Sequence, residues 1–406
     1  MAKRDKSVGQ DPLDGIMEDF YKSGSGKAEN KDNDSENENY ERQESSRKKE
    51  PNWDRANLED YDLAKLMVIG VGGGGNNAID RMERAGLDGV QLVSINTDAQ
   101  VLEMNRSDRS IQIGKELTGG LGAGGNPEIG REAALENQEM LEKLLKDIDM
   151  LFLTCGMGGG TGTGATPVIA EVAQKMEILT TGIVTKPFSF EGKERAEKAD
   201  RGLKNLTDKV DTIITISNDR LLEVAPGNIS LINAFGMVDE ILMQGVRGIS
   251  ELITVPGMIN LDFADLRNAM KDGGHALMGI GEAEGEGKTK KAAENAISSP
   301  LLEGSIEGAK NVIINVTGGP KLSLEEVTEA AKLVQGEADE EADIVFGTTI
   351  KDGLDTVKLT VIATGYNQHG SGDKTEDLRR LGLSGEENGN LRDENDLDVP
   401  TFLRRG

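Results

Sequence analysis

The stretch from Gly156 to Gly164 constrains this chain more than any other, because six of its nine residues carry no side chain. It follows an apolar run over 149–154 that is typical of a buried strand, and it precedes a predicted helix over 165–175. Glycines at such a turn let the backbone approach a ligand closely, and the N-terminus of a helix favours an anion. A tight turn without a ligand needs only one or two glycines, so the stretch favours a phosphate-binding site.

Two further glycine-rich segments each follow a predicted strand or precede a predicted helix. In the first, Gly70, Gly72 and Gly75 satisfy the G-x-G-x-x-G pattern, and Asp98 lies near the position of a ribose-binding acid. The second, over 118–127, precedes a predicted helix over 128–146. The first segment alone would fit a nicotinamide-dependent dehydrogenase of the Rossmann type. Three glycine segments suit several phosphates better than a single pyrophosphate.

The order of predicted strands and helices indicates an α/β protein with two domains. Strands and helices alternate up to residue 218, which predicts a doubly wound sheet with its ligand at the carboxyl ends of the strands. Apolar residues at helical spacing from Ser230 onward predict a helix of some 25 residues that bridges two domains. Beyond it, four short apolar strands and two helices, over 289–298 and 323–335, predict a smaller α/β domain.

Composition separates the folded part of the chain from its polar ends. We expect a disordered acidic arm over 1–60, a nucleotide-binding domain over 61–229, the bridging helix over 230–255 and a C-terminal domain over 256–366. A disordered linker over 367–395 and a terminal peptide over 396–406 complete the prediction.

Charge and cysteine content exclude several classes of function. The formal net charge is −26, and most of it lies in the predicted folded part, so nucleic acid is not an expected partner. The acidity fits either a salt-rich cytoplasm or simple solubility. With Cys155 as the single cysteine and two histidines, neither an intramolecular disulfide nor a zinc site is expected. The chain begins with no signal peptide and holds no apolar run of membrane-spanning length, so we expect a soluble cytoplasmic protein.

Four motifs in order resemble those of the FtsZ family, the bacterial tubulin-like cell-division GTPases. The most specific is Gly158-Gly159-Gly160-Thr161-Gly162-Thr163-Gly164, and the other three begin at Asn96, Pro187 and Asn260. The resemblance covers residues 61–366 and the last eleven. It implies a tubulin/FtsZ-like fold in which a Rossmann-like GTP-binding domain and a smaller α/β domain are joined by a long central helix. It also implies a cytoplasmic protein that forms a ring at mid-cell.

The resemblance further implies which residues bind GTP or GDP. Glu191 and Arg195 would contact the ribose, although spacing alone also fits a surface ion pair. The base would lie on the side chains of Asn218, Phe235 and Asp239. Mg²⁺ would enter with the nucleotide, without a confident protein ligand, and would supply the positive charge that the lysine-free loops lack. The residues implied for the phosphates are Gly73, Gly74, Gly75, Asn76, Asn77, Ala123, Gly124, Gly125, Asn126, Gly160, Thr161 and Gly162.

Catalysis is implied to need a second copy of the chain. In the family, the loop that corresponds to Asn260, Asp262 and Asp265 reaches the nucleotide of the neighbouring subunit, so hydrolysis follows head-to-tail assembly. From spacing alone the two acids also fit a solvated loop with a capping role. A non-hydrolysing tubulin-like structural paralogue is a further alternative.

The end of the chain is similar to the peptide by which the family docks on membrane tethers and division regulators. Its implied contact residues are Val399, Pro400, Phe402, Leu403, Arg404 and Arg405. Membrane contact would then be indirect. Spacing alone leaves open an apolar cluster without a function.

Overall fold

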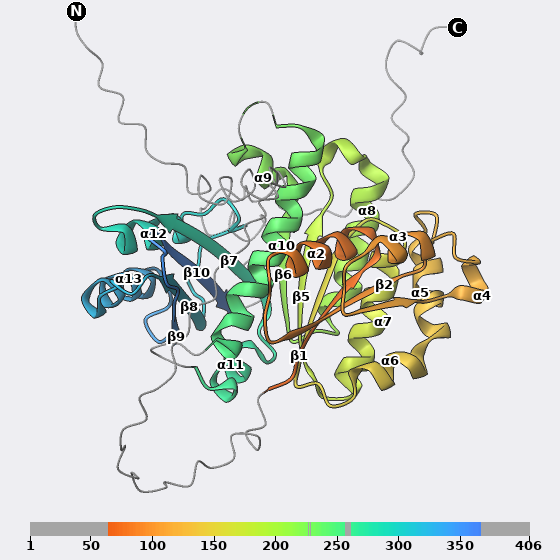
Figure 1. Ribbon diagram of the computed structural model, residues 1–406, viewed down its shortest axis with the longest axis horizontal. Coiled ribbons are helices and arrows are strands. Elements are labelled where there is room, and N and C mark those ends of the chain that lie inside the picture. Colours follow the sequence, from red (N-terminus) through yellow and green to blue (C-terminus); the bar gives the residue numbers. More distant parts are fainter. Residues whose placement is uncertain (1–63, 226, 228, 256–260, 367–406) are drawn as a thin grey trace, which may run out of the picture. The chain divides into compact units, whose positions relative to one another are not determined.

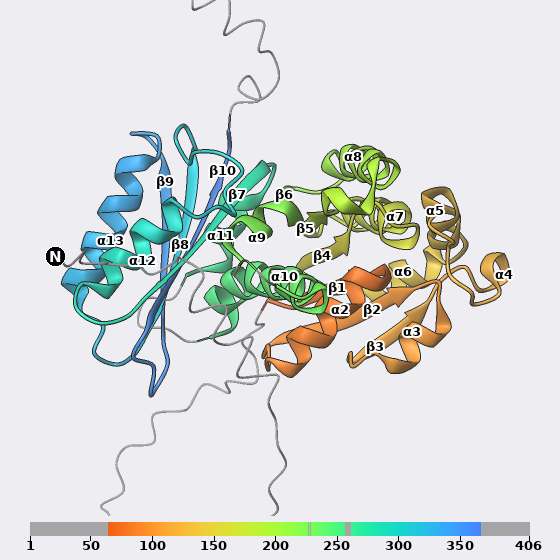
Figure 2. The same cartoon turned by 90° about the horizontal axis from the view of Figure 1, so that it is seen from above.

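The computed structural model describes residues 64–225, 227, 229–255 and 261–366. Their strands form one sheet in the order β3-β2-β1-β4-β5-β6-β7-β10-β8-β9 (Figures 1 and 2; all ten strands are labelled in Figure 2). Neighbouring strands from β3 to β7 pair in parallel, as expected for a doubly wound sheet. The strands are β1 (Leu66–Val71), β2 (Val90–Asn96), β3 (Arg109–Gln112), β4 (Met150–Gly156), β5 (Leu179–Lys186), β6 (Thr212–Ser217), β7 (Gly274–Ala283), β8 (Asn311–Gly318), β9 (Asp343–Ile350) and β10 (Val357–Thr364).

Helices connect these strands and cover both faces of the sheet. They are α2 (Gly72–Arg84), α3 (Ala99–Met104), α4 (Lys115–Thr118), α5 (Pro127–Glu136), α6 (Gln138–Leu145), α7 (Thr161–Lys175), the short 3₁₀ helix η2 (Ser189–Glu191), α8 (Lys193–Thr207), α9 (Asn218–Val224), α10 (Leu231–Thr254), α11 (Phe263–Met270), α12 (Lys288–Ile297) and α13 (Leu324–Glu337).

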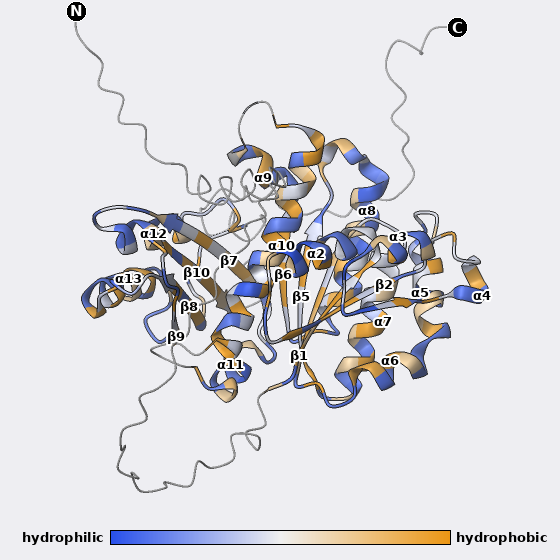
Figure 3. Cartoon of the chain, in the orientation of Figure 1, coloured by the Kyte–Doolittle hydropathy of each residue, from blue (hydrophilic) through white to orange (hydrophobic). Residues whose placement is uncertain are grey.

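Two buried clusters sandwich the parallel part of the sheet. Helices α5, α6, α7 and α8 bury apolar residues against one face, and α2 and α10 bury theirs against the other (Figure 2). The strands between them are mostly apolar, while the outward faces of the helices are hydrophilic (Figure 3). Buried parallel strands need this cover on both faces, which explains their near-continuous Val, Ile and Leu content.

The long helix α10 lies between the two domains, as the apolar periodicity predicts (Figures 1 and 2). It begins where the Ser230 hydroxyl accepts a hydrogen bond from the amide of Asn233. Its buried residues belong to a cluster that also includes Met278 on β7 and Ile313 on β8. One core therefore joins the nucleotide-binding domain to the C-terminal domain through α10.

The C-terminal domain is a smaller α/β unit built on β7, β10, β8 and β9. β10 pairs antiparallel with both β7 and β8, whereas β9 is parallel to β8. Helices α12 and α13 pack on one face of these strands. Helix α13 begins with a capping box, since Ser323 and Glu326 exchange hydrogen bonds.

The structure corrects the predicted bounds of two helices and shows that a third begins inside a glycine segment. Helix α7 begins at Thr161 rather than residue 165, and α2 begins at Gly72, so several glycines of the predicted loops form the first turns of helices. The predicted helix over 128–146 is two helices, because Asn137 leaves helical geometry with φ of −112° and ψ of 20°. Glycine weakens a helix interior but is tolerated in a first turn that packs against backbone. The Cβ of an alanine at position 164 would lie only 1.8 Å from the carbonyl oxygen of Pro127.

In the described part of the chain, no helix is both long and apolar enough to span a bilayer. The predicted arm over 1–60, the linker over 367–395 and the terminal peptide over 396–406 lie outside the described residues. The same holds for Asn260 and for the six residues predicted to bind partners, Val399, Pro400, Phe402, Leu403, Arg404 and Arg405.

Candidate nucleotide site

A cavity of about 220 Å³ opens at the carboxyl ends of β1, β4, β5 and β6. Ligands of open α/β sheets bind at this edge, where the loops that follow parallel strands meet. Its walls come from the first glycine segment, the central glycine stretch, η2, the start of α8, the start of α9 and the first half of α10. The residues that line it are Val71, Gly72, Gly73, Gly74, Asn77, Gly156, Met157, Gly159, Gly160, Thr161, Gly162, Thr185, Pro187, Glu191, Arg195, Asn218, Phe235, Val238, Asp239 and Leu242.

Two helix N-termini without side-chain caps meet at this cavity. Neither Val71 before α2 nor Gly160 before α7 accepts a hydrogen bond with its side chain, unlike the caps of α3, α5, α10, α11 and α13. Helices α4, α6, α8, α9 and α12 also begin without a side-chain cap. The first amides of α2 and α7 are thus left for a ligand. Uncapped N–H groups and the positive ends of two helix dipoles favour an anion.

The two glycine segments touch backbone to backbone. A Cβ at Gly72, where φ is +72°, would lie 2.8 Å from the amide nitrogen of Gly162. A Cβ at Gly158, where φ is +96°, would lie 2.6 Å from the carbonyl oxygen of Arg195. Glycine is therefore required at both positions for packing as well as for conformation.

The two threonines of the central stretch hold the loops in place. Thr161 Oγ1 lies 2.7 Å from the hydroxyl of Thr97, and Thr163 Oγ1 accepts a hydrogen bond from the amide of Gly158 at 2.8 Å. Thr161 also lines the cavity, but Thr163 does not. Thr163 therefore shapes the loop, and of the two hydroxyls only that of Thr161 is placed to donate to a phosphate in the cavity.

The far wall of the cavity combines a ring, an amide and a carboxyl group. The ring of Phe235 lies edge-on to that of Phe188. Asn218 is buried, and its Oδ1 atom has no hydrogen-bond partner in the structure. Burial is the main cause that raises the pKa of Asp239 to about 7. A flat ring beside an unpartnered acceptor and a carboxyl group suits a base that presents N–H donors.

Glu191 and Arg195 form the ion pair that their spacing predicts, and both also line the cavity. Arg195 Nε lies 3.1 Å from Glu191 Oε2, and Glu191 Oε1 accepts a hydrogen bond from the amide of Phe188 at 2.9 Å. The surface-pair interpretation and the binding interpretation therefore do not exclude each other. Among the described residues that line the cavity, Arg195 is the only cation.

Family models identify both domains. Residues 65–226 match the model described as the Tubulin/FtsZ family, GTPase domain. Residues 274–367 match the FtsZ family, C-terminal domain. This chain belongs to the FtsZ family.

Solved structures agree with the family assignment. An FtsZ dimer from M. jannaschii, described as empty, is 47% identical, with a TM-score of 0.72 over 74% of this chain and 88% of that chain. A tryptophan-to-tyrosine mutant of M. jannaschii FtsZ is 46% identical, with a TM-score of 0.72 over 75% of this chain and 92% of that chain. CetZ2 from Haloferax volcanii, described as a GTPγS-bound protofilament, shares the fold at 20% identity, with a TM-score of 0.65 over 78% of this chain and 97% of that chain.

Seven residues that the FtsZ resemblance assigns to the nucleotide do not line the cavity: Gly75, Asn76, Asp98, Ala123, Gly124, Gly125 and Asn126. Asn76 is buried and donates hydrogen bonds to the carbonyl oxygens of Gly70 and Ile95, which ties α2 to β1 and β2. Asp98 and Asn126 cap α3 and α5. These observed roles are structural, and direct contact with a nucleotide stays a prediction for all seven.

Sequence reasoning missed several lining residues of this FtsZ-family site, notably Val238 and Leu242. Phe235, Val238, Asp239 and Leu242 are spaced at i, i+3, i+4 and i+7 on α10, so they lie on one face of the helix. Helical periodicity could have found Val238 and Leu242 once Phe235 and Asp239 were assigned.

The acids implied for catalysis lie apart from the cavity. Asp262 caps α11, because its Oδ1 accepts a hydrogen bond from the amide of Ala264 at 3.0 Å, and Asp265 is exposed in the first turn. Neither lines the cavity. The cavity residues of α10 occupy its first half, while α11 follows its C-terminal end (Figure 1). A helix of 24 residues is about 36 Å long, so the acids and the cavity of one molecule belong to opposite ends of α10.

Proposed function

We propose that this protein is a GTP hydrolase that assembles head to tail into filaments, and that these filaments form the cytokinetic ring at the division site. The separation of Asp262 and Asp265 from the cavity carries the proposal. The exposed acids and the anion-binding cavity lie at opposite ends of α10. The acids can therefore reach a bound nucleotide only in a neighbouring molecule. A contact of this kind is heterologous and need not close, so it generates filaments.

Exposed apolar side chains near the cavity support a subunit contact there. Phe190 adjoins Glu191, and Leu231 and Ile232 lie within one turn of Phe235 at the start of α10; all three side chains are more than half exposed. Covering such groups in an interface is favourable. Self-association of related proteins, seen in the M. jannaschii FtsZ dimer and the CetZ2 protofilament, supports self-association of this chain.

Different residues of the cavity bind the phosphates, the ribose and the base of the nucleotide. The uncapped amides at the starts of α2 and α7 bind the phosphates. The predicted phosphate-binding residues that line the cavity are Gly73, Gly74, Asn77, Gly160, Thr161 and Gly162. Glu191 and Arg195 bind the ribose. Phe235 stacks on the base, and Asn218 and Asp239 select guanine. The carboxylate of Asp239 matches the N1–H and 2-amino donors of guanine, an adjacent pair that adenine does not present. When bound with the nucleotide, Mg²⁺ neutralises phosphate charge; we assign it no protein ligand.

Hydrolysis is completed by the next subunit. Asp262 and Asp265 orient and polarise the attacking water, with Asn260 assisting, while the amides of α2 and α7 stabilise charge on the γ-phosphate.

The terminal peptide docks on membrane tethers and regulators, so contact with the membrane is indirect. Its contact residues are Val399, Pro400, Phe402, Leu403, Arg404 and Arg405.

The decisive experiment measures GTP turnover per molecule against protein concentration. We expect turnover to rise steeply across the concentration at which filaments sediment, because each site needs a neighbour. Turnover that stays flat across that concentration would contradict the proposal.

A non-hydrolysing structural paralogue is the main alternative. The exposed carboxylates of Asp262 and Asp265 favour hydrolysis, since a paralogue without turnover has no need of them. Sedimentation with GTP followed by phosphate release distinguishes the two. The family match argues against a nicotinamide-dependent dehydrogenase, and guanine rather than nicotinamide in co-purified nucleotide would exclude it.

A further inference from the structure

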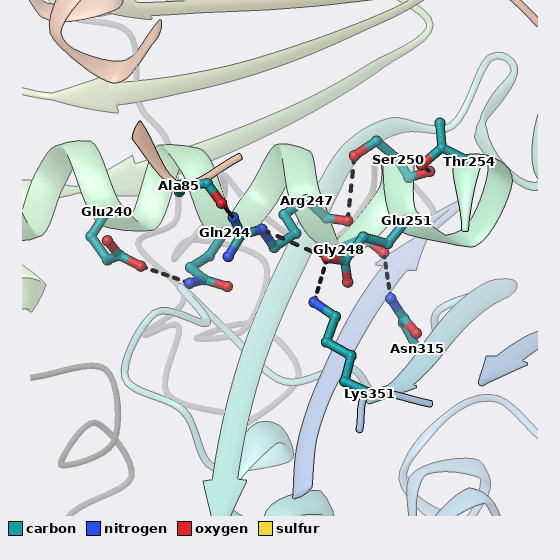
Figure 4. A network of polar contacts seen from close by, with 10 residues as sticks. All are labelled: Ala85, Glu240, Gln244, Arg247, Gly248, Ser250, Glu251, Thr254, Asn315 and Lys351. Carbon is teal, nitrogen blue, oxygen red and sulfur yellow. Dashed lines mark hydrogen bonds and ion pairs between the residues drawn. The ribbon is translucent and has the colours of Figure 1, made fainter. Parts of the chain in front are cut away.

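A charged cluster joins α2 to α10 directly behind the base-binding wall. Arg81 Nε on α2 lies 2.5 Å from Glu240 Oε2 on α10, and their side chains are only 22% and 6% exposed. The other oxygen, Glu240 Oε1, accepts a hydrogen bond from Gln244 Nε2 at 2.6 Å (Figure 4). Glu240 is thus a buried carboxylate with both oxygens bonded, and its geometry fixes Arg81 in turn.

Asp239, the residue before Glu240, faces the nucleotide cavity. Burial raises its pKa, Arg81 lowers it, and Asp80 and Glu240 raise it further. Asp80 pairs with Arg84 on the surface of α2, and Glu191 and Arg195, across the cavity, pair with each other. Arg81 is therefore the cation that acts against burial and two neighbouring carboxylates.

The protonation state of Asp239 decides what it can recognise. A carboxylate accepts hydrogen bonds at both oxygens, so it can pair with N1–H and the 2-amino group of guanine together. A protonated carboxyl group keeps one acceptor and turns the other oxygen into a donor, which would oppose the amino group. Hypoxanthine lacks that amino group, so the affinity for its nucleotides should depend far less on the protonation state of Asp239.

We propose that Arg81 is a positioning residue for base recognition: through its ion pair with Glu240 it holds the base-binding face of α10 against α2, and its positive charge favours the carboxylate form of the adjacent Asp239 that guanine requires. The proposal rests on the nucleotide-binding role proposed above and adds a determinant of its specificity.

A second contact supports the same geometry. Arg247 Nη2 on α10 donates a hydrogen bond to the carbonyl oxygen of Ala85, the residue that ends α2, at 3.0 Å (Figure 4). Helix α2 is thus joined to α10 at two points, and its N-terminus carries the cavity-lining Gly73 and Gly74. The phosphate-binding and base-binding walls are therefore held at a fixed separation.

The test compares the affinities of GDP and inosine diphosphate from about pH 6 to about pH 9, by calorimetry with the full chain. The two nucleotides share the same phosphates, so the ratio of their dissociation constants isolates the amino group. In the unchanged protein we expect GDP to bind at least about tenfold more tightly above pH 8, since a hydrogen bond to a charged group is strong. The preference should shrink below pH 7 as Asp239 takes up a proton.

Arg81→Gln should lose most of the preference at neutral pH and regain it only at higher pH, while Arg81→Lys should retain it. Arg84→Gln is the matched control on the same helix and should match the unchanged protein. If Arg81→Gln does not fold, the double variant with Glu240→Gln removes both buried charges. Because Glu240 raises the pKa of Asp239 and Arg81 lowers it by more, the double variant should show a smaller loss of the preference in the same direction.

Two results would overturn the inference. One is an equal loss of affinity in Arg81→Gln for both nucleotides at every pH, as a purely structural brace would give. The other is a GDP preference in the unchanged protein that does not vary with pH. Absence of GDP binding by the unchanged protein is a distinct result, which would defeat the proposed function itself.

Discussion

The ring of Phe235 lies edge-on to the ring of Phe188, with centroids 5.3 Å apart and ring planes at 90°. Phe188 is buried, and on another side it stacks against Phe190 with centroids 5.0 Å apart. A ring held edge-on by a buried neighbour keeps its orientation. Phe235 is therefore preset to present a flat face to a base in the cavity.

Replacing Phe235 by leucine should weaken GDP binding about tenfold or more, because aromatic stacking on a base contributes roughly 1–3 kcal/mol. Calorimetric titration measures the loss. Phe190→Leu is the matched control, since Phe190 contacts the same Phe188 but does not line the cavity. Equal losses in the two variants would show that the aromatic cluster acts only through packing.

Asp265→Ala should leave GDP affinity unchanged and lower GTP turnover by at least about 100-fold, the range of a lost general base. Asn268→Ala, also exposed on α11, serves as the control. Asp262 needs a different substitution, because it caps α11: Asp262→Asn should keep the cap, whereas alanine would also cost about 1 kcal/mol of stability. Unchanged hydrolysis in Asp265→Ala would remove this acid from the mechanism.

Mixing tests whether the acids act on the neighbouring subunit. Asp265→Ala supplies an intact cavity, and Asp239→Ala supplies intact acids. If each site is completed by two molecules, the mixture should turn over GTP faster than either variant alone. Strictly additive rates would indicate that each molecule hydrolyses by itself.

Lys351→Met should destabilise the fold by about 1–2 kcal/mol, as judged by the midpoint of urea unfolding. Lys351 Nζ lies 2.9 Å from Glu251 Oε1, whose side chain is 11% exposed, and this pair connects the loop after β9 to α10 (Figure 4). Without Lys351 the mostly buried carboxylate retains its longer pair with Arg247, at 3.7 Å. The control is Lys290→Met, which breaks a solvent-exposed pair with Glu329 and should cost less than about 0.5 kcal/mol. A Lys351→Met protein as stable as the control would show that the pair does not hold the domains.

Cys155 should not react with a thiol reagent in the native protein. It is fully buried at the end of β4, and burial raises the pKa of its thiol to about 12. At pH 8 only about one molecule in ten thousand carries the reactive thiolate. A disulfide reagent should therefore release its coloured product only after denaturant has unfolded the protein. Rapid reaction under native conditions would indicate a redox role for Cys155 rather than a role in packing alone.

The alternation of strands and helices, the long helix and the Ser323 capping box could all be predicted because their signals are local. The boundaries at Thr161 and Gly72 could not, since glycine-rich sequence predicts a loop and only packing against neighbouring backbone makes it helical. Asp98 and Asn126 show a similar limit. A polar residue before a helix fits a cap and a ligand contact equally well, and their hydrogen bonds identify them as caps.

The residues of the cavity could be predicted where they belong to a sequence motif, and not where they depend on contacts between distant parts of the chain. The glycine segments have characteristic patterns, whereas Asp239 on α10 was implied only by the family resemblance. The partnership of Arg81 with Glu240 joins residues 159 positions apart, and no spacing rule connects them. The same holds for β6 and β7, which pair across the whole length of α10.

The pairing of β6 with β7 makes the solubility of the GTPase domain depend on the C-terminal domain. Strand β7 joins β6 through only three residue pairs, from Gly274 to Ala276, before it continues into the antiparallel half of the sheet. A chain cut after α11 would leave β6 as a bare edge strand, with unpaired backbone groups and the apolar underside of α10 exposed to water. Such edges template aggregation. The C-terminal domain thus protects the GTPase domain from intermolecular strand addition, and the two cannot be expected to persist as separate soluble modules.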